Sequence, residues 1–356
     1  MTRSLRPLPA LRTARGFSLV ELLVAAAIGL ILLAGLSTLF VNNTRTQAEI
    51  EKTHRQVENG RYAIDLLAVD LRNAGYFAEF NPTLLATPAV LPAPCSTALA
   101  DLHAGLALAV QGVDDGDAGL DCLDDLRAGT DVLVVRRTAA CIAGQAGCDA
   151  ASGPGPFFQA SLCNDATELN SPKVTDFYAL SLDTAGLTRR ARNCSVPAAL
   201  RRYKTHLYFV ANNNTAKDGI PTLKRAELVA DGAGAAWRIV PLAEGIENLQ
   251  LEYGLDLAPA GGDGVAELTA ADPAKADGCA APACAAGNWR GAVAVRLHVL
   301  ARNAAATAGW VDKKTYTLGR KADGSSNDIA AAGDPYKRHV FQALVALPNP
   351  AGRRIP

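Results

Sequence analysis

The sequence lacks an excess of charge of either sign, because its 356 residues include 35 Lys and Arg and 35 Asp and Glu. Nucleic-acid-binding domains typically carry a clear basic excess, so this balance argues against a dedicated nucleic-acid-binding protein. No segment repeats at a fixed period, which argues against a solenoid. A phosphate-binding glycine loop, a nucleophile elbow and an HExxH motif are also missing, so the sequence offers no catalytic residue and no cofactor site.

Charge is also missing from residues 22–41, which form a continuous apolar run. A helix of about 20 residues rises by about 30 Å, the thickness of the hydrocarbon core of a bilayer. The segment can therefore span a membrane. Glu21 lies at its edge, where a carboxylate that faces lipid is costly, so we expect this charge to have a partner.

The flank before the apolar run is basic, with no acid before Gly16 and with arginines at Arg3, Arg6, Arg12 and Arg15. By the positive-inside rule this flank stays in the cytoplasm and the rest of the chain lies on the other side of the membrane. A secretory signal is cleaved at small residues after its apolar region, whereas here the small residue Gly16 precedes that region.

The order Gly-Phe-Ser-Leu-Val-Glu at residues 16–21 resembles the prepilin signal of type IV pilins and type II secretion pseudopilins. The resemblance implies cleavage between Gly16 and Phe17 by a prepilin peptidase, N-methylation of Phe17 and retention of the apolar helix. It also implies that Glu21 pairs with the N-terminal amine of a neighbouring subunit during assembly. A cationic amine needs such an acid where the dielectric constant is low. The alternative is a plain signal anchor in which Glu21 reaches the membrane interface.

Residues 42–75 are expected to continue the helix as an amphipathic segment. Hydrophobic residues recur every seven positions, at Ile50, Val57, Ile64 and Leu71, with Leu67 between the last two. This stripe would face a folded domain. Gly60 is expected to weaken the helix locally, by about 1 kcal/mol relative to alanine.

Residues 58–67 and 70–77 resemble the segment after the membrane helix in PilW-type minor pilins, whose closest secretion-system relatives are the J-type minor pseudopilins. Read without the resemblance, the charged side chains in these segments are expected to be solvated. They are Arg61, Asp65, Asp70 and Arg72.

The remaining residues, 76–356, predict a β-rich head. Strands are expected at 130–137, 206–211, 222–228, 237–241, 246–255, 289–303 and 339–347, with a hairpin formed by 174–182 and 187–192. Loop insertions are expected at about 95–128, 139–172 and 258–288. The predicted fold is therefore α+β and pilin-like: a leader at 1–16, a membrane helix at 17–41, an amphipathic helix at 42–75, and an antiparallel β head.

The eight cysteines predict disulfides rather than a zinc site. The local pairs have six and four intervening residues and the five histidines are scattered, whereas zinc commonly takes four ligands from closely spaced pairs. An exported head permits disulfides, and the pairs Cys141 with Cys148 and Cys279 with Cys284 are the local candidates. Eight cysteines allow 105 pairings, so the full connectivity stays open.

The sequence contains two clusters of like charge, and for both a solvent-exposed loop or surface is a simpler interpretation than a binding site. The acidic cluster comprises Asp114, Asp115, Asp117, Asp121, Asp124 and Asp125. It lacks the register of a calcium-binding EF-hand loop, so no metal is predicted. The basic block comprises Arg189, Arg190, Arg192, Arg201, Arg202 and Lys204. A solvated or subunit-facing surface is favoured there over binding to DNA phosphates.

The resemblance implies a non-enzymatic minor pilin of a Gram-negative type IV pilus. Such a subunit inserts into the inner membrane, helps to initiate pilus assembly and then sits near the filament tip. Its implied partners are other minor pilins, the major pilin and a large tip adhesin. One alternative is a J-type minor pseudopilin of type II secretion. Another is a membrane-anchored periplasmic enzyme or binding protein, which would require a convergent polar site.

Overall fold

The computed structural model describes residues 16–116, 120–153, 155–232, 234–258 and 262–354. Five charged residues discussed above lie outside these ranges: Arg3, Arg6, Arg12, Arg15 and Asp117. The chain falls into two compact units, divided between Glu51 and Lys52.

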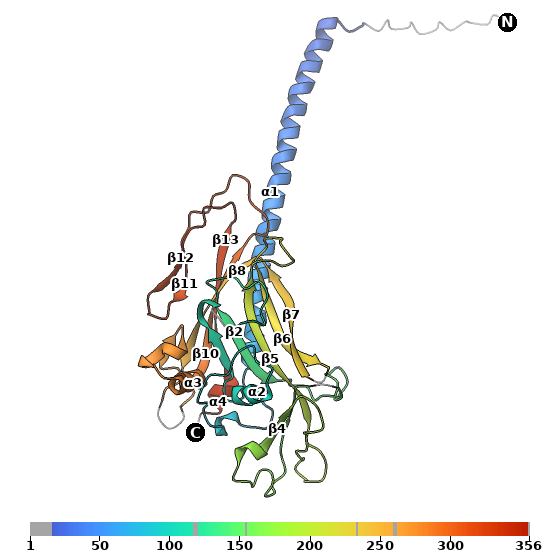
Figure 1. Cartoon of the computed structure of the whole chain (residues 1–356). Coiled ribbons are helices and arrows are strands. Elements are labelled where there is room, and N and C mark those ends of the chain that lie inside the picture. Colours follow the sequence, from blue (N-terminus) through green and yellow to red (C-terminus); the bar gives the residue numbers. More distant parts are fainter. Residues whose placement is uncertain (1–15, 117–119, 154, 233, 259–261, 355–356) are drawn as a thin grey trace, which may run out of the picture. The chain divides into compact units, whose positions relative to one another are not determined.

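The first unit consists of the N-terminal part of helix α1 (Leu19–Asn73) and the residues before it. The apolar side chains of this part are exposed, for example those of Leu22, Ile31 and Phe40. Among the described residues, α1 is the one helix that is long and apolar enough to cross a membrane (Figure 1). This matches the expected membrane span in length and composition.

The second unit contains two antiparallel sheets and a separate hairpin. The seven-stranded sheet consists of β1 (Val110–Val113), β2 (Val132–Thr138), β3 (Phe157–Ala160), β4 (Tyr178–Ser181), β5 (Leu200–Ala211), β6 (Thr222–Asp231) and β7 (Gly234–Glu244). The four-stranded sheet has the order β13 (Arg338–Ala346), β10 (Ala292–Arg302), β8 (Ile246–Leu255) and β9 (Leu268–Ala270). The hairpin is formed by β11 (Tyr316–Arg320) and β12 (Ser326–Ile329).

Short helices connect these strands. They are α2 (Leu99–Gly105), α3 (Pro282–Arg290) and α4 (Pro348–Gly352), together with the 3-10 segments η1 (Pro82–Leu84), η2 (Asp114–Gly116), η3 (Val174–Phe177) and η5 (Pro273–Gly278).

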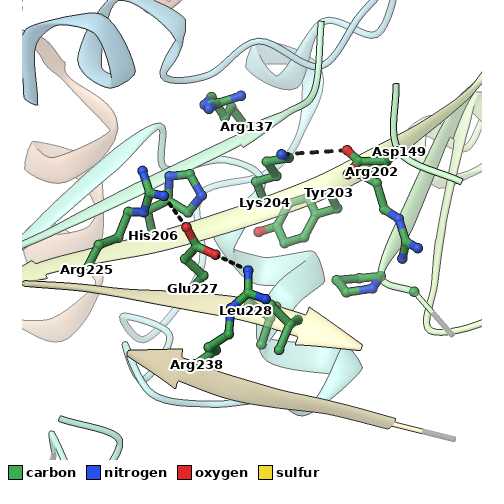
Figure 2. Close-up of a pocket in the computed structure, with 13 residues that line it drawn as sticks. Arg137, Asp149, Arg202, Tyr203, Lys204, His206, Arg225, Glu227, Leu228 and Arg238 are labelled. Atoms are coloured by element: carbon green, nitrogen blue, oxygen red, sulfur yellow. Dashed lines mark hydrogen bonds and ion pairs between the residues drawn. The ribbon is translucent and has the colours of Figure 1, made fainter. Parts of the chain in front are cut away.

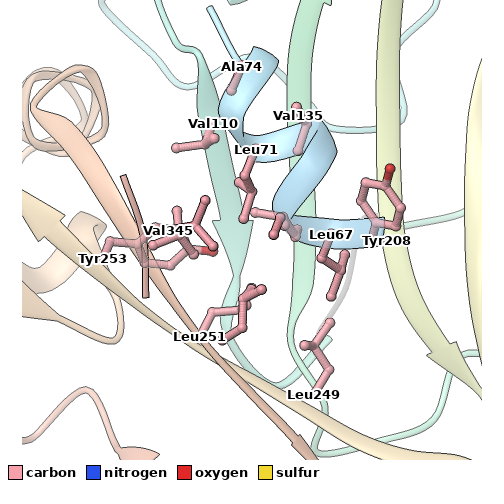
Figure 3. Close-up of a cluster of buried hydrophobic side chains, with 14 of the residues drawn as sticks. Leu67, Leu71, Ala74, Val110, Val135, Tyr208, Leu249, Leu251, Tyr253 and Val345 are labelled. Carbon is pink, nitrogen blue, oxygen red and sulfur yellow. The ribbon is translucent and has the colours of Figure 1, made fainter. Parts of the chain in front are cut away.

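The C-terminal part of α1 packs into the core of this second unit (Figure 3). Leu67 and Leu71 are fully buried against strands of both sheets, among them β2, through Val135, and β8, through Leu249 and Leu251. Burying one leucine side chain contributes about 1.5–3 kcal/mol. The predicted α+β fold, a long N-terminal helix with an antiparallel β-rich head and disulfide-bearing loops, is therefore confirmed.

The predicted hairpin of 174–182 with 187–192 is wrong. Tyr178–Ser181 pairs instead with Phe157–Ala160, and Val174–Phe177 is a 3-10 turn. The partner strand β3 lies inside a segment that was expected to be a loop. It has only four residues, and such a short run between glycine- and proline-rich stretches carries little periodic signal.

The insertion at 258–288 is more ordered than a loop, because it contains β9, η5 and most of α3. Trp289 consequently lies in the last turn of a helix instead of starting a strand. Strand β10 is covered on both faces. On one face Val295, Leu297 and Val299 lie in the core. On the other face His298 is only 3% exposed and lies 3.0 Å from Glu252, and Leu300 packs with side chains of the β11–β12 hairpin.

The buried stripe of α1 differs from the predicted heptad. Ile50 is 51% exposed and Val57 and Ile64 are only partly buried, whereas small residues are buried, among them Gly60 and Ala63. A Cβ atom at Gly60 would lie 2.2 Å from Cε2 of Phe341 on β13. Gly60 therefore permits a close approach of β13 to the helix.

Replacing Gly60 by alanine should lower the free energy of unfolding by about 1–3 kcal/mol, because the new methyl group displaces the Phe341 ring. Alanine is intrinsically favoured over glycine in a helix by about 1 kcal/mol, so helix propensity alone predicts the opposite sign. The measurement is urea unfolding of the detergent-solubilised chain, followed by the fluorescence of its three tryptophans, of which Trp289 is 2% exposed.

Glu58→Ala, at an exposed position of the same helix, serves as the control and should change stability by less than about 0.5 kcal/mol. A Gly60→Ala variant more stable than the wild type would contradict the close approach.

Candidate functional site

The start of α1 places the predicted processing and assembly residues together. Gly16 and Phe17 precede the helix outside regular secondary structure, Phe17 is 90% exposed, and a Cβ atom at Gly16 would meet nothing within 4 Å. The peptide bond between these two residues is therefore accessible among the described residues.

Ser18 and Glu21 form a reciprocal cap at this helix start. The backbone N–H of Ser18 donates to Glu21 Oε2 at 2.9 Å, and the backbone N–H of Glu21 donates to Ser18 Oγ at 3.2 Å. This is a capping box, which satisfies two N–H groups that a helix otherwise leaves unpaired. This role of Ser18 was not predicted from the sequence, although the S-x-x-E pattern before an apolar run is a signal for it.

The capping bond leaves Glu21 able to bind a cation as well. An ionised carboxylate offers about four lone-pair positions, so it can accept one backbone N–H and still pair with an ammonium group. The exposed first turn of α1 thus presents an acid that a neighbouring amine can reach.

At the other end of α1, Asp70 corrects the expectation of a solvated charge, because it is only 4% exposed. Arg137 Nε on β2 donates to Asp70 Oδ1 at 2.6 Å, and the Tyr208 hydroxyl on β5 donates to Oδ2 at 2.8 Å. His206 Nδ1, also on β5, lies 2.7 Å from Oδ2. Asp70 therefore ties the helix to two strands. By contrast, Arg61, Asp65 and Arg72 are exposed as predicted.

Burial of Asp70 on its own would raise its pKa. The hydrogen bond and charge of His206, together with those of Arg137, outweigh burial and hold the pKa of Asp70 well below its usual range. The carboxylate is therefore ionised at neutral pH. Sequence periodicity could not reveal this role, because the strands that carry its partners are distant in the chain.

Four disulfides close loops of the head and leave no free cysteine among the described residues. They are Cys95–Cys122, Cys141–Cys148, Cys163–Cys194 and Cys279–Cys284. The two short-range pairs are the ones expected from the sequence. The other two join cysteines 27 and 31 residues apart, and spacing alone did not identify them.

The acidic cluster is not gathered into one site. Asp121, Asp124 and Asp125 are exposed, whereas carboxylate oxygens of Asp114 and Asp115 lie within 4.8 Å of one of buried Asp131. Asp131 accepts the backbone N–H groups of Asp115 and Leu251, and these bonds offset part of the cost of its burial. A second acidic group consists of Asp256, Asp263 and Glu267. Neither group of carboxylates by itself identifies a metal-binding site.

The basic block is likewise dispersed. Arg190 pairs with Asp165 and Glu168, Arg189 donates to the Tyr178 carbonyl, and Arg201 is buried. Only Arg202 and Lys204 of the block line a common cleft. The residues of the block therefore do not form one continuous basic surface, and a subunit-facing role for the block stays a prediction.

Comparisons with known proteins relate the chain to pilus assembly. A family model described as Type IV Pilus-assembly protein W matches residues 207–349, from the middle of β5 into α4. A model of the prokaryotic N-terminal methylation motif matches residues 11–37. A type IV-like pilin from Thermus thermophilus has a similar solved structure, with 13% identity, coverage of 83% of this chain and 96% of that chain, and a TM-score of 0.34. No curated protein matches the chain.

Replacing Asp70 by asparagine should lower the free energy of unfolding by about 2–4 kcal/mol near neutral pH, because Arg137 loses its buried counter-charge. Since the folded-state pKa of Asp70 is lowered, its contribution is present above the ordinary carboxyl pKa near 3.9 and is lost as the pH falls toward the folded-state pKa. The difference between wild type and Asp70→Asn in urea unfolding should therefore shrink below about pH 4.

Asp65→Asn, on the exposed side of the same helix, is the matched control. Equal stabilities of the Asp70→Asn and Asp65→Asn variants at pH 7 would show that Asp70 does not anchor the helix.

Proposed function

We propose that this chain, a pilus-assembly protein of the PilW type with an N-terminal methylation motif, is a minor pilin that helps to initiate assembly and sits near the filament tip. The observation that carries the proposal is the combination of a prepilin-type sequence at the start of α1 with a PilW-type head at residues 207–349. The family is structural, and the proposed mechanism is assembly without enzymatic chemistry.

The proposed sequence of events begins at the inner membrane, with the basic N-terminus in the cytoplasm and the head in the periplasm. A prepilin peptidase cleaves between Gly16 and Phe17, and Phe17 is N-methylated. The apolar part of α1 then packs with the helices of other subunits. There Glu21 pairs with the Phe17 amine of a neighbour, and this pairing removes an isolated charge from a medium of low dielectric constant.

The proposed partners are other minor pilins, the major pilin and a tip adhesin, contacted through the head. The four disulfides support a head that works outside the cytoplasm, since oxidising compartments preserve such bonds. A J-type pseudopilin of type II secretion is the second candidate, because it shares the signal. The match to the PilW model favours the pilus, and the neighbouring genes distinguish the two.

Replacing Gly16 by leucine should leave the leader attached, because the prepilin peptidase requires a small residue before the cleaved bond. Immunoblots and intact-mass measurements of the membrane fraction should then show only the full-length precursor. Thr13→Leu adds similar bulk three residues earlier and should mature normally. Normal maturation of the Gly16→Leu variant would contradict the assigned cleavage site.

Replacing Glu21 by alanine should leave maturation intact but reduce surface pili at least tenfold in a strain that lacks the native copy, because the neighbour's amine loses its counter-charge. Pili are counted by electron microscopy after shearing. Ser18→Ala is the control, since it removes only the cap, worth about 1 kcal/mol, and keeps the carboxylate. Piliation that survives Glu21→Ala would refute the pairing role.

A further inference from the structure

A cleft of about 330 Å³ lies on the face of the seven-stranded sheet near the middle of β5 and β6 (Figure 2). Side chains of β2, β5, β6 and β7 line it, together with the chain around Asp149 and Pro156. The lining side chains stand mostly on paired strands, so the cleft is largely pre-formed.

Cations outnumber carboxylates in this cleft. Its cationic side chains are Arg137, Arg202, Lys204, Arg225 and Arg238, and its carboxylates are Asp149 and Glu227. Glu227 is shared, because both Arg225 and Arg238 pair with it. Lys204 Nζ lies 3.6 Å from Asp149 Oδ2, which is longer than a good hydrogen bond. The internal acids therefore do not balance the positive charge.

The cleft also contains a polar atom without a partner. Arg225 Nε is buried and has no hydrogen-bond partner among the described residues. An unpaired buried donor costs about 1–3 kcal/mol, so an acceptor placed in the cleft would recover part of that cost.

Contacts with Asp70 fix the positions of two side chains that line the cleft. Arg137 and His206 both line the cleft and both contact Asp70 on α1. Because Asp70 already holds these two side chains in place, little further ordering is needed when a ligand binds. Arginine guanidinium groups present parallel N–H donors that match the two oxygens of a carboxylate or a phosphate.

We propose that this cleft binds a single oxyanion group, a carboxylate or a phosphate, between Lys204, Arg225 and Arg238. The volume is at the lower end of the range for ligand pockets and suits one small anion or one acidic side chain. The proposal does not depend on filament membership, because it concerns only the chemistry of the head.

The test is isothermal titration calorimetry of the full detergent-solubilised chain at low ionic strength, with inorganic phosphate in one arm and N-acetylglutamate in the other, its α-carboxyl group blocked as the amide so that the side-chain carboxylate is its one charge. Saturable one-to-one binding is expected. Lys204→Gln, at a partly exposed position, and Arg238→Gln, at an exposed one, should each weaken it at least fivefold. Arg61→Gln, on the exposed face of α1, should leave it unchanged. Tighter phosphate binding identifies a free oxyanion, and tighter N-acetylglutamate binding identifies an acidic side chain of a partner.

Glu227→Gln should change the affinity for anions in the opposite direction. It removes the internal acid that competes for Arg225 and Arg238, so the same anions should bind at least threefold more tightly. Thermal melts confirm that each variant is folded. The proposal fails if neither anion saturates, or if the Arg61→Gln control weakens binding as much as the cleft variants do, which would indicate an adventitious ion only.

Discussion

The structure depends first on a carboxylate at the edge of an uncharged apolar helix. Glu21 precedes about 20 residues without charge, and the capping bond with Ser18 satisfies only part of its hydrogen-bonding capacity. In a bilayer or a bundle of helices such a charge requires a cation. The proposed cleavage after Gly16 creates one on Phe17 of every subunit. In this proposal, one electrostatic requirement links processing, membrane retention and assembly.

The same helix uses a second carboxylate to hold the head. Asp70 is buried and binds groups on β2 and β5, while Gly60 lets Phe341 of β13 pack against the helix. The C-terminal part of α1 is therefore a component of the core and not only an amphipathic cover. The residues held by Asp70 also border the cationic cleft, so the helix contributes to the arrangement of that surface.

Sequence reasoning succeeded where the signal is local. The long helix, the strand at residues 132–138 and the strands around residues 206–211 and 246–255 were predictable from apolar runs. It failed where pairing is non-local. The strand Phe157–Ala160 is too short to show a period, and its pairing with Tyr178–Ser181 depends on the assembled sheet. The burial of Asp70 and the longer disulfides likewise arise from residues brought together only by folding.

The most direct test of this account is the mass of the N-terminal peptide of the chain in sheared, purified filaments. Digestion and tandem mass spectrometry should identify a peptide that begins at N-methylated Phe17 and retains the apolar run. The signal should be far weaker than that of the major pilin, as expected for a minor subunit. A chain that begins at Met1, or that stays in the membrane fraction and is absent from filaments, would contradict the account.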